Sequence, residues 1–193
     1  MTARERILQS AKELFAKKGY KNTSVEEIVQ QAGISKGGFY FYFKSKSELM
    51  KELIEQMAQR TKDIMRKWLQ KETSAEEAIK GHIMEFLREC YSERHIAYIF
   101  FFELLCGEEE FRKLHKKHME EIRGLLTQMI KRGYERKEFL CGSVETLTNL
   151  IVGYIKLIYM EELLLKDKPL EEILARAEEG LELIMRGVKC VGS

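Results

Sequence analysis

The chain has 193 residues, 45% of them hydrophobic and 33% charged, which is typical of a globular protein with a substantial core. It contains no run of about 18 apolar residues, and its charged start is unlike a secretory signal; the composition therefore excludes a conventional membrane protein and favours the cytoplasm. The net charge is only +2, but residues 1–46 hold nine Lys and Arg against four Glu, so this end can attract phosphates.

Two helices are predicted at the start of the chain, over residues 2–18 and 25–32. Apolar residues recur at helical spacing in both segments, and Gly19 stands where the first should end. The second can begin with either of two capping boxes, Ser24 with Glu27 or Thr23 with Glu26.

A glycine turn separates the second helix from a third, which is predicted over residues 36–43. Gly33 suits the left-handed residue that ends a helix, and Ser35 can cap the next one. Two short helices joined by a turn of this length are typical of a helix-turn-helix, whose second helix can enter the major groove of DNA. Residues 23–49 therefore carry the main functional signal of the sequence.

The third helix has an unusual composition, in which two glycines precede five aromatic residues. By propensity alone this run favours a turn and a strand. Helical spacing explains it better, because Phe39 and Phe43 then face a core. The outward stripes hold Lys36, Tyr40 and Tyr42, which can bond phosphate oxygens and base edges. The alternative is an aromatic plug whose glycines only shape the turn.

The same stretch resembles the TetR family of bacterial transcriptional regulators. The residues that carry this resemblance are Thr23, Val25, Ile28, Ala32, Gly33, Ile34, Ser35, Gly37, Tyr40, Tyr42, Phe43, Lys46 and Leu49. One position departs from the pattern, because Gly38 stands where the family more often has Ala, Thr or Ser. The resemblance implies an all-α fold of about nine helices, with a three-helix helix-turn-helix head and a six-helix regulatory and dimerisation domain.

The resemblance also implies a set of DNA-contacting residues. The set comprises Thr23, Ser35, Lys36, Gly37, Gly38, Tyr40, Tyr42 and Lys46. We expect Thr23, Tyr40 and Lys46 to bind phosphates, with Lys36 and Tyr42 nearer the bases. The two glycines would let the backbone approach the duplex closely.

Helical periodicity continues through the rest of the chain, which has one proline and no alternating strand pattern. Six further helices are predicted, over residues 45–71, 74–90, 95–106, 109–134, 143–166 and 169–188. We expect two domains: residues 1–46 form the helix-turn-helix DNA-binding domain, and residues 47–193 form the ligand-binding and dimerisation domain.

The last two predicted helices carry more apolar surface than one protomer needs. Two such helices from each of two chains can form a four-helix interface with twofold symmetry. The alternative is a terminal pair that packs only on its own core. The predicted interface comprises Ile151, Ile155, Ile158, Ile173, Leu174, Ala177, Leu181 and Ile184.

A small-molecule pocket within the second domain is a further implication of the resemblance. The candidate lining residues are Met57, Met65, Trp68, His82, Phe86, Phe101, His118, Ile122 and Tyr154. Residues of these types favour an apolar or aromatic effector with one or two polar handles. The alternative is that they form ordinary core.

The four histidines and four cysteines lack metal-ligand spacing, and no nucleophile motif is present; no metal, cofactor or active site is therefore expected. We expect a homodimeric repressor that binds a palindromic DNA operator and releases it when a small-molecule effector binds. The alternatives are an activator or ligand-independent regulator of the same family, an all-helical enzyme with a vestigial head, and a helical protein-binding adaptor.

Overall fold

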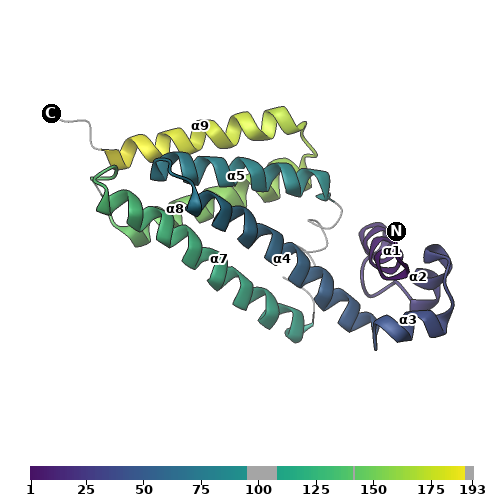
Figure 1. The fold of residues 1–193 in the computed structure, drawn as a ribbon. Helices are drawn as coiled ribbons and strands as arrows, with labels where there is room; N and C mark the ends of the chain where they lie inside the picture. Colours follow the sequence, from purple (N-terminus) through teal and green to yellow (C-terminus); the bar gives the residue numbers. More distant parts are fainter. Residues whose placement is uncertain (95–107, 141, 190–193) are drawn as a thin grey trace. The chain divides into compact units, whose positions relative to one another are not determined.

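The computed structural model describes residues 1–94, 108–140 and 142–189 (Figure 1). Every regular element in these ranges is a helix, which confirms the predicted all-α fold. The helices are α1 (Ala3–Lys18), α2 (Val25–Ala32), α3 (Lys36–Tyr42), α4 (Lys46–Gln70), α5 (Ala75–Ser92), α7 (Glu109–Glu135), α8 (Val144–Leu157), η1 (Ile158–Leu165) and α9 (Leu170–Lys189). The helix predicted over residues 95–106, with the candidate Phe101, lies outside the described residues.

Side-chain caps explain where the first two helices begin. The Thr2 hydroxyl accepts a hydrogen bond from the Glu5 N–H (3.2 Å), and the Glu5 carboxylate accepts one from the Thr2 N–H (2.7 Å). Ser24 and Glu27 form the same reciprocal pair at the start of α2, at 3.2 and 2.9 Å. The structure thus selects the Ser24 capping box over the alternative.

In the described part of the chain, no helix combines the length and apolar composition that a bilayer-spanning segment requires.

The chain divides into two compact units. The first, which we call the head unit, contains Met1–Ala58 and Glu93–Lys117; the second, the body unit, contains Gln59–Ser92 and His118–Ser193. Because α4 and α7 each run across this division, both helices contribute residues to both units.

The core of the head unit combines α1 to α4 with the first turn of α7. Tyr20 is only 5% exposed and meets two rings edge-on, with centroid distances of 5.4 Å to Phe15 and 5.3 Å to Phe111. Phe111 is fully buried and belongs to α7. A residue far away in sequence therefore completes the core that supports α2 and α3.

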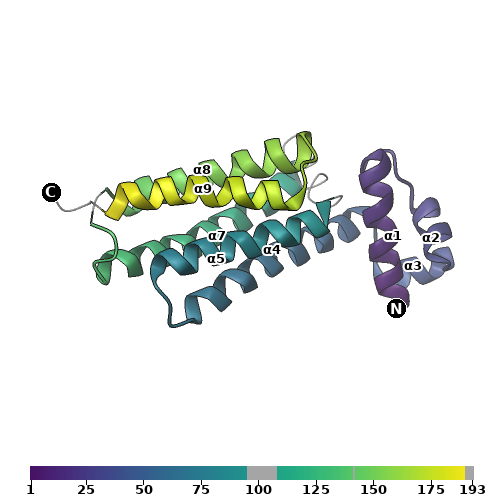
Figure 2. The same ribbon diagram turned by 90° about the horizontal axis from the view of Figure 1, so that it is seen from above.

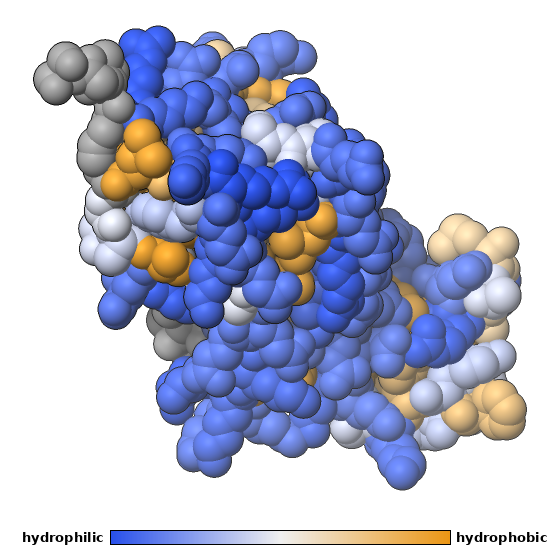
Figure 3. Space-filling view, turned by 60° about the vertical axis from the view of Figure 1, so that its left-hand side comes forward, coloured by the Kyte–Doolittle hydropathy of each residue, from blue (hydrophilic) through white to orange (hydrophobic). Residues whose placement is uncertain are grey.

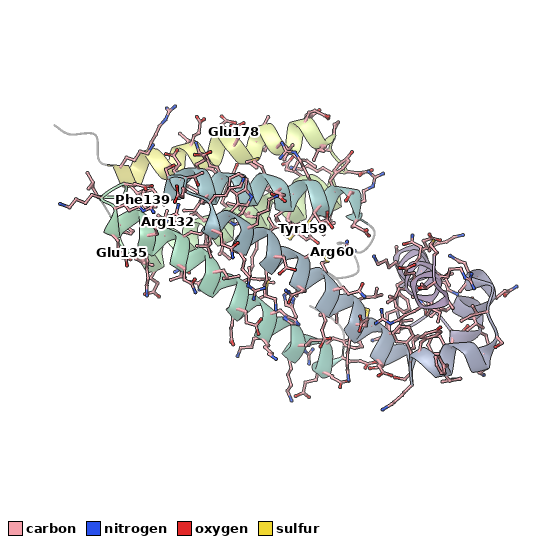
Figure 4. The ribbon with its side chains drawn as sticks, in the orientation of Figure 1. Arg60, Arg132, Glu135, Phe139, Tyr159 and Glu178 are labelled. Carbon is pink, nitrogen blue, oxygen red and sulfur yellow. The ribbon has the colours of Figure 1, made fainter. Side chains whose placement is uncertain are left out.

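In the body unit, α5 and α8 both pack beside α9 (Figure 2). The helix α8 continues directly into η1, a π-helical segment, so together they match the single helix predicted over residues 143–166. Arg132 of α7 (Figure 4) donates hydrogen bonds to the carbonyls of Leu69 (3.0 Å) and Thr73. This guanidinium satisfies carbonyl groups at the end of α4 and in the turn that follows it.

Candidate DNA interface and effector site

The turn between α2 and α3 has the predicted geometry. Gly33 adopts a left-handed conformation with φ of 64° and ends α2 by donating its N–H to the Val29 and Gln30 carbonyls. The Ser35 hydroxyl accepts a hydrogen bond from the Gly38 N–H (3.1 Å), which caps α3. These contacts confirm the helix-turn-helix that the sequence predicts.

The two sides of α3 differ sharply in exposure. Phe39 and Phe43 are 0% and 3% exposed and belong to the core of the head unit, as predicted. On the other side, Tyr40 is 49%, Phe41 81% and Tyr42 39% exposed. An aromatic plug would account for the buried pair only, so the three outward rings require another explanation.

Phe41 is absent from the predicted DNA-contacting set. The sequence feature that could have identified Phe41 is its position between Tyr40 and Tyr42. It lies on the outward side of a helix whose inward side is set by Phe39 and Phe43. Its ring meets the Tyr42 ring edge-on, with 5.0 Å between centroids. A phenylalanine in this position can contact the methyl group of a thymine in the major groove.

Lys36 lies at the start of α3 and forms an ion pair with Glu26 of α2. Both side chains are more than half exposed, so the pair contributes little to folding stability. The hydrogen bond between them lowers the pKa of the Glu26 carboxyl and raises that of the Lys36 ammonium. The ammonium is therefore firmly charged, but an acidic partner competes for it before any DNA binds.

Thr23 and Lys46 hold the loop between α1 and α2. Thr23 is only 2% exposed, and its hydroxyl donates to the Gly19 carbonyl (2.9 Å). The Lys46 ammonium donates to the carbonyls of Tyr20 and Thr23, both at 2.7 Å, and lies 4.4 Å from the centroid of the Tyr20 ring. Both residues thus shape the loop itself, and contacts from them to phosphates stay a prediction.

Neither Gly37 nor Gly38 is required by packing within the head unit. A Cβ atom at Gly37 would lie 3.9 Å from the Ser35 hydroxyl oxygen, and one at Gly38 would lie 3.4 Å from the same atom. Both are ordinary contact distances, so the fold itself has room for a side chain. Packing within the head unit therefore does not explain why both positions are glycine.

Three of the predicted effector contacts, Met57, Trp68 and Tyr154, make packing contacts with other parts of the chain. Met57 packs against the core of the head unit. The Trp68 ring covers Gly81 of α5 and its Nε1 donates to Glu85 (2.9 Å), while the Tyr154 ring covers Gly180 of α9. A Cβ atom at either glycine would collide with the ring, so each aromatic residue packs closely against a neighbouring helix. Contacts from all three to an effector stay a prediction.

The remaining described candidates belong to the body unit. Met65, His82 and His118 are 2%, 6% and 7% exposed, while Phe86 and Ile122 are half-buried. Phe86 stacks on Tyr159 of η1, with 6.2 Å between ring centroids. Tyr159 was not predicted from the sequence as a site residue.

Burial keeps several polar groups of this interior uncharged. It lowers the pKa of His82 to about 4, although a hydrogen-bond contact with the Ala78 carbonyl (3.1 Å) opposes the shift. It raises the pKa of Tyr159 and of the Cys90 thiol far above their ordinary values. At neutral pH all three are therefore neutral. Among the described residues, no three His, Cys, Asp or Glu side chains gather as metal ligands would.

A buried lysine also lies inside the body unit. Lys62 of α4 is 6% exposed, and its ammonium lies 2.6 Å from a carboxylate oxygen of Glu121 and 3.4 Å from Nδ1 of His118. Neither Lys62 nor Glu121 was predicted from the sequence as a site residue. The available signal was the position of Lys62, four residues after Ala58 and three before Met65, in an apolar stripe of α4.

The predicted dimer interface is only partly available. Ile151, Ile158, Ile173, Ala177 and Leu181 are at most 2% exposed within one chain, so they form the core of the body unit. Ile155, Leu174 and Ile184 are half-buried. The prediction is corrected for the five core residues, because a side chain enclosed by its own chain cannot contact a second copy.

Other apolar residues of α8 and α9 are exposed. Leu150 and Leu157, two turns apart on α8, are 51% and 49% exposed, and Leu183 of α9 is 64% exposed. The exposed glycines Gly153 and Gly187 lie near them in sequence, with open space around their Cα atoms. Hydrophobic patches interrupt an otherwise hydrophilic surface in Figure 3. We call Leu150, Gly153, Leu157, Leu183 and Gly187 the outer stripe.

Comparisons with known proteins agree with this architecture. The family "Bacterial regulatory proteins, tetR family" matches residues 7–53, and the family "Tetracyclin repressor-like, C-terminal domain" matches residues 77–184. The solved structure of a transcriptional regulator of the TerR/AcrR family from Aquifex aeolicus VF5 is 35% identical. It covers 95% of this chain and 99% of that chain, with a TM-score of 0.82.

Two further relatives extend the comparison. The fatty acid metabolism regulator protein of Bacillus subtilis is 25% identical over 94% of this chain and 93% of its own length. An uncharacterized helix-turn-helix transcriptional regulator of the same species, YerO, is 51% identical, but the match covers only 24% of this chain and 16% of that relative. Because a C-terminal family match spans more than half of the chain and a 35% identical relative spans nearly all of it, this protein belongs to the TetR family of bacterial regulatory proteins.

Proposed function

We propose that this protein is a cytoplasmic transcriptional repressor. It binds an operator as a homodimer through residues 1–46 and releases it when a small molecule binds within residues 47–193. The observation that carries this proposal is the outward face of α3, where three aromatic rings and a charged Lys36 stand on a helix capped and oriented by α2. A helix presented in this way fits the major groove.

Contacts to DNA divide into two groups. Tyr40 and Ser35 offer hydroxyl groups to phosphates, while the rings of Phe41 and Tyr42 offer apolar and polar edges to the bases. Gly37 and Gly38 let the backbone approach, since no packing in the head unit demands a glycine at either position. Lys36 joins this surface by exchanging Glu26 for a phosphate or a base edge.

The homodimer forms mainly through the outer stripe of α8 and α9, together with the residues of the predicted interface that are not buried in the core. Its exposed leucines are large enough to anchor an interface, and Gly153 and Gly187 let helices of two copies approach closely. The half-buried Ile155, Leu174 and Ile184 supply further apolar contact. Twofold symmetry would present two copies of α3 to half-sites about one DNA turn, ~34–36 Å, apart.

The effector binds inside the body unit, near Met65 and the stacked pair of Phe86 and Tyr159. These groups favour an apolar or aromatic molecule with few polar handles. A structural neighbour of 23% identity, FadR of Bacillus subtilis, was solved in complex with stearoyl-CoA, whose long acyl chain supports an effector with an apolar part. Because α4 and α7 belong to both units, a change in their packing is a route from effector to DNA.

The test begins by selecting fragments that the full chain binds from genomic or random DNA. Replacing Lys36 and Tyr40 together by Ala should weaken binding to the selected fragment at least 100-fold, because both side chains are exposed and serve no core. Binding by the wild type should also weaken steeply with salt. Lys67→Ala, at an exposed α4 lysine of the body unit, is the control. A wild type that selects no DNA, or a double variant that binds normally, would overturn the proposal.

A further inference from the structure

Lys62 is the only lysine or arginine in the described part of the chain that is buried. Its side chain is 8% exposed, and the α4 stripe that contains it also holds the buried residues Ala58 and Met65. An ammonium in such surroundings loses most of its hydration, so it is rare unless a specific anion compensates. Its position therefore identifies a place inside the body unit where negative charge is favoured.

The anion that compensates Lys62 comes from near the surface. Glu121 of α7 lies 2.6 Å from the ammonium, yet its side chain is 41% exposed. His118, one turn earlier on α7 and 7% exposed, brings Nδ1 to 3.4 Å from the same ammonium and to 3.9 Å from the Glu121 carboxylate. The three groups form a polar path from the solvent-exposed carboxylate to the buried cation.

Stability alone is a weak reason for this arrangement. Replacing a buried ion pair by apolar residues of similar volume often leaves a protein equally or more stable, because the pair must lose its hydration. A methionine at position 62 would continue the apolar stripe of α4. A buried lysine whose partner is half in water instead has the properties of a binding site, because water can rehydrate the carboxylate when another anion replaces it.

We propose that Lys62, assisted by His118, binds the anionic group of the effector in exchange for Glu121. The ligand class is an amphiphile with one oxyanion, a carboxylate or a phosphate, attached to an apolar body. Its oxyanion accepts hydrogen bonds from Lys62, and its apolar body occupies the part of the body unit that contains Met65 and Ile122. Lys62 keeps an anionic partner throughout, while the Glu121 carboxylate turns to solvent. This deepens the proposed function, on which it rests for the consequence at DNA.

Direct binding to the full chain without DNA tests the site. The probes are decanoate, decyl phosphate and the neutral methyl decanoate, each below its micellar concentration and measured by calorimetry and thermal shift. The wild type should bind one or both anions at least tenfold more tightly than the methyl ester. A preference for decanoate or for decyl phosphate distinguishes the two oxyanions. Equal binding of all three probes, binding of the ester alone, or no binding would overturn the proposal.

Two variants assign the effect to this cluster. Lys62→Met should weaken anion binding at least tenfold and leave methyl decanoate unchanged, because only the charge is lost. Glu121→Gln should strengthen anion binding severalfold, because it removes the competing carboxylate while preserving the shape of the side chain. A merely structural cluster would give neither result: there, Lys62→Met would bind anions like the wild type and Glu121→Gln would not tighten binding. Lys67→Met, at an exposed ion pair with Glu85, is the matched control.

The effect of the probes on DNA binding is measured separately. Decanoate or decyl phosphate, whichever binds, should release wild-type protein from its selected fragment but not release Lys62→Met. Failure to bind DNA in the absence of any probe contradicts the proposed function, whereas normal DNA binding without a preference for anions contradicts only the site at Lys62. Release of Lys62→Met at the wild-type probe concentration would equally overturn the site.

Discussion

In the head unit, large aromatic side chains lie on the outside of α3, whereas in the body unit a lysine and two histidines lie among apolar side chains. Phe41 is 81% exposed, while Lys62 is 6% exposed. Both reverse the usual division between apolar interior and polar surface, and such reversals are more informative than the many residues that follow the rule. The head unit is thus equipped to recognise a partner on its surface, and the body unit to accept a ligand in its interior.

The largest effect is expected from disrupting the homodimer, because the surface of the head unit would then bind DNA one copy at a time. Replacing Leu157 and Leu183 by Arg should separate the dimer and weaken operator binding about a thousandfold, since each head would then bind its half-site alone. Analytical ultracentrifugation and DNA titration measure the two effects. Gln128→Arg, on an exposed face of α7, adds one arginine away from the outer stripe and should change neither. A double variant that stays dimeric would refute the role of the outer stripe.

The buried imidazole of His82 gives the next largest effect. Burial lowers its pKa to about 4, so below the ordinary histidine value the unfolded chain binds more protons than the folded chain. The contribution of His82 to folding stability is then fully present above about pH 6.5. The free energy of unfolding should fall by about 3 kcal/mol as the pH is lowered to 4. Urea unfolding of the wild type and of His82→Leu over this range isolates the contribution. Parallel losses in the two proteins would show that His82 does not titrate as stated.

Phe41 tests whether the outward aromatic face reads sequence. Phe41→Ala should weaken operator binding about tenfold and relax the preference for thymine at one position of each half-site. Titration against fragments with single base changes measures both effects. Phe41→Leu keeps apolar surface and should retain most of the affinity. Unaltered affinity and preference in Phe41→Ala would assign recognition to the other residues of α3.

The smallest effect concerns Glu26, which holds Lys36 in an ion pair. Glu26→Gln should strengthen DNA binding about two- to threefold at low salt, because it frees the ammonium and removes a negative charge beside the phosphates. Glu55→Gln, at an exposed carboxylate of α4, controls for the change in net charge. Equal gains in both variants would mean that only net charge matters.

Local signals predicted the head unit well. Capping at Ser24 and Ser35, the left-handed Gly33, and the burial of Phe39 and Phe43 each depend on residues within a few positions along the chain. Such signals are readable because hydrogen bonds at helix ends and helical spacing are short-range. The burial of Phe111 in the same core could not be predicted from local signals, since α7 begins more than sixty residues after the end of α3.

The body unit was predicted less well, for a specific reason. Trp68 and Tyr154 were predicted to line a pocket, and the contact of each ring with a glycine of another helix, Gly81 or Gly180, was not predicted. The sequence shows large residues and small residues separately and does not reveal which of them meet. Lys62 was overlooked in the same way, because a lysine is assumed to face water until a neighbouring helix encloses it.

The sequence by itself determined that the chain is helical, where most helices begin and end, and that residues 23–49 form a helix-turn-helix. The tertiary structure alone decided which apolar face of α8 and α9 is core and which stays outside, because both faces satisfy the same helical period. It also decided that Lys62 lies inside and Phe41 outside. Helical period and capping are local properties, whereas burial depends on which helices pack together.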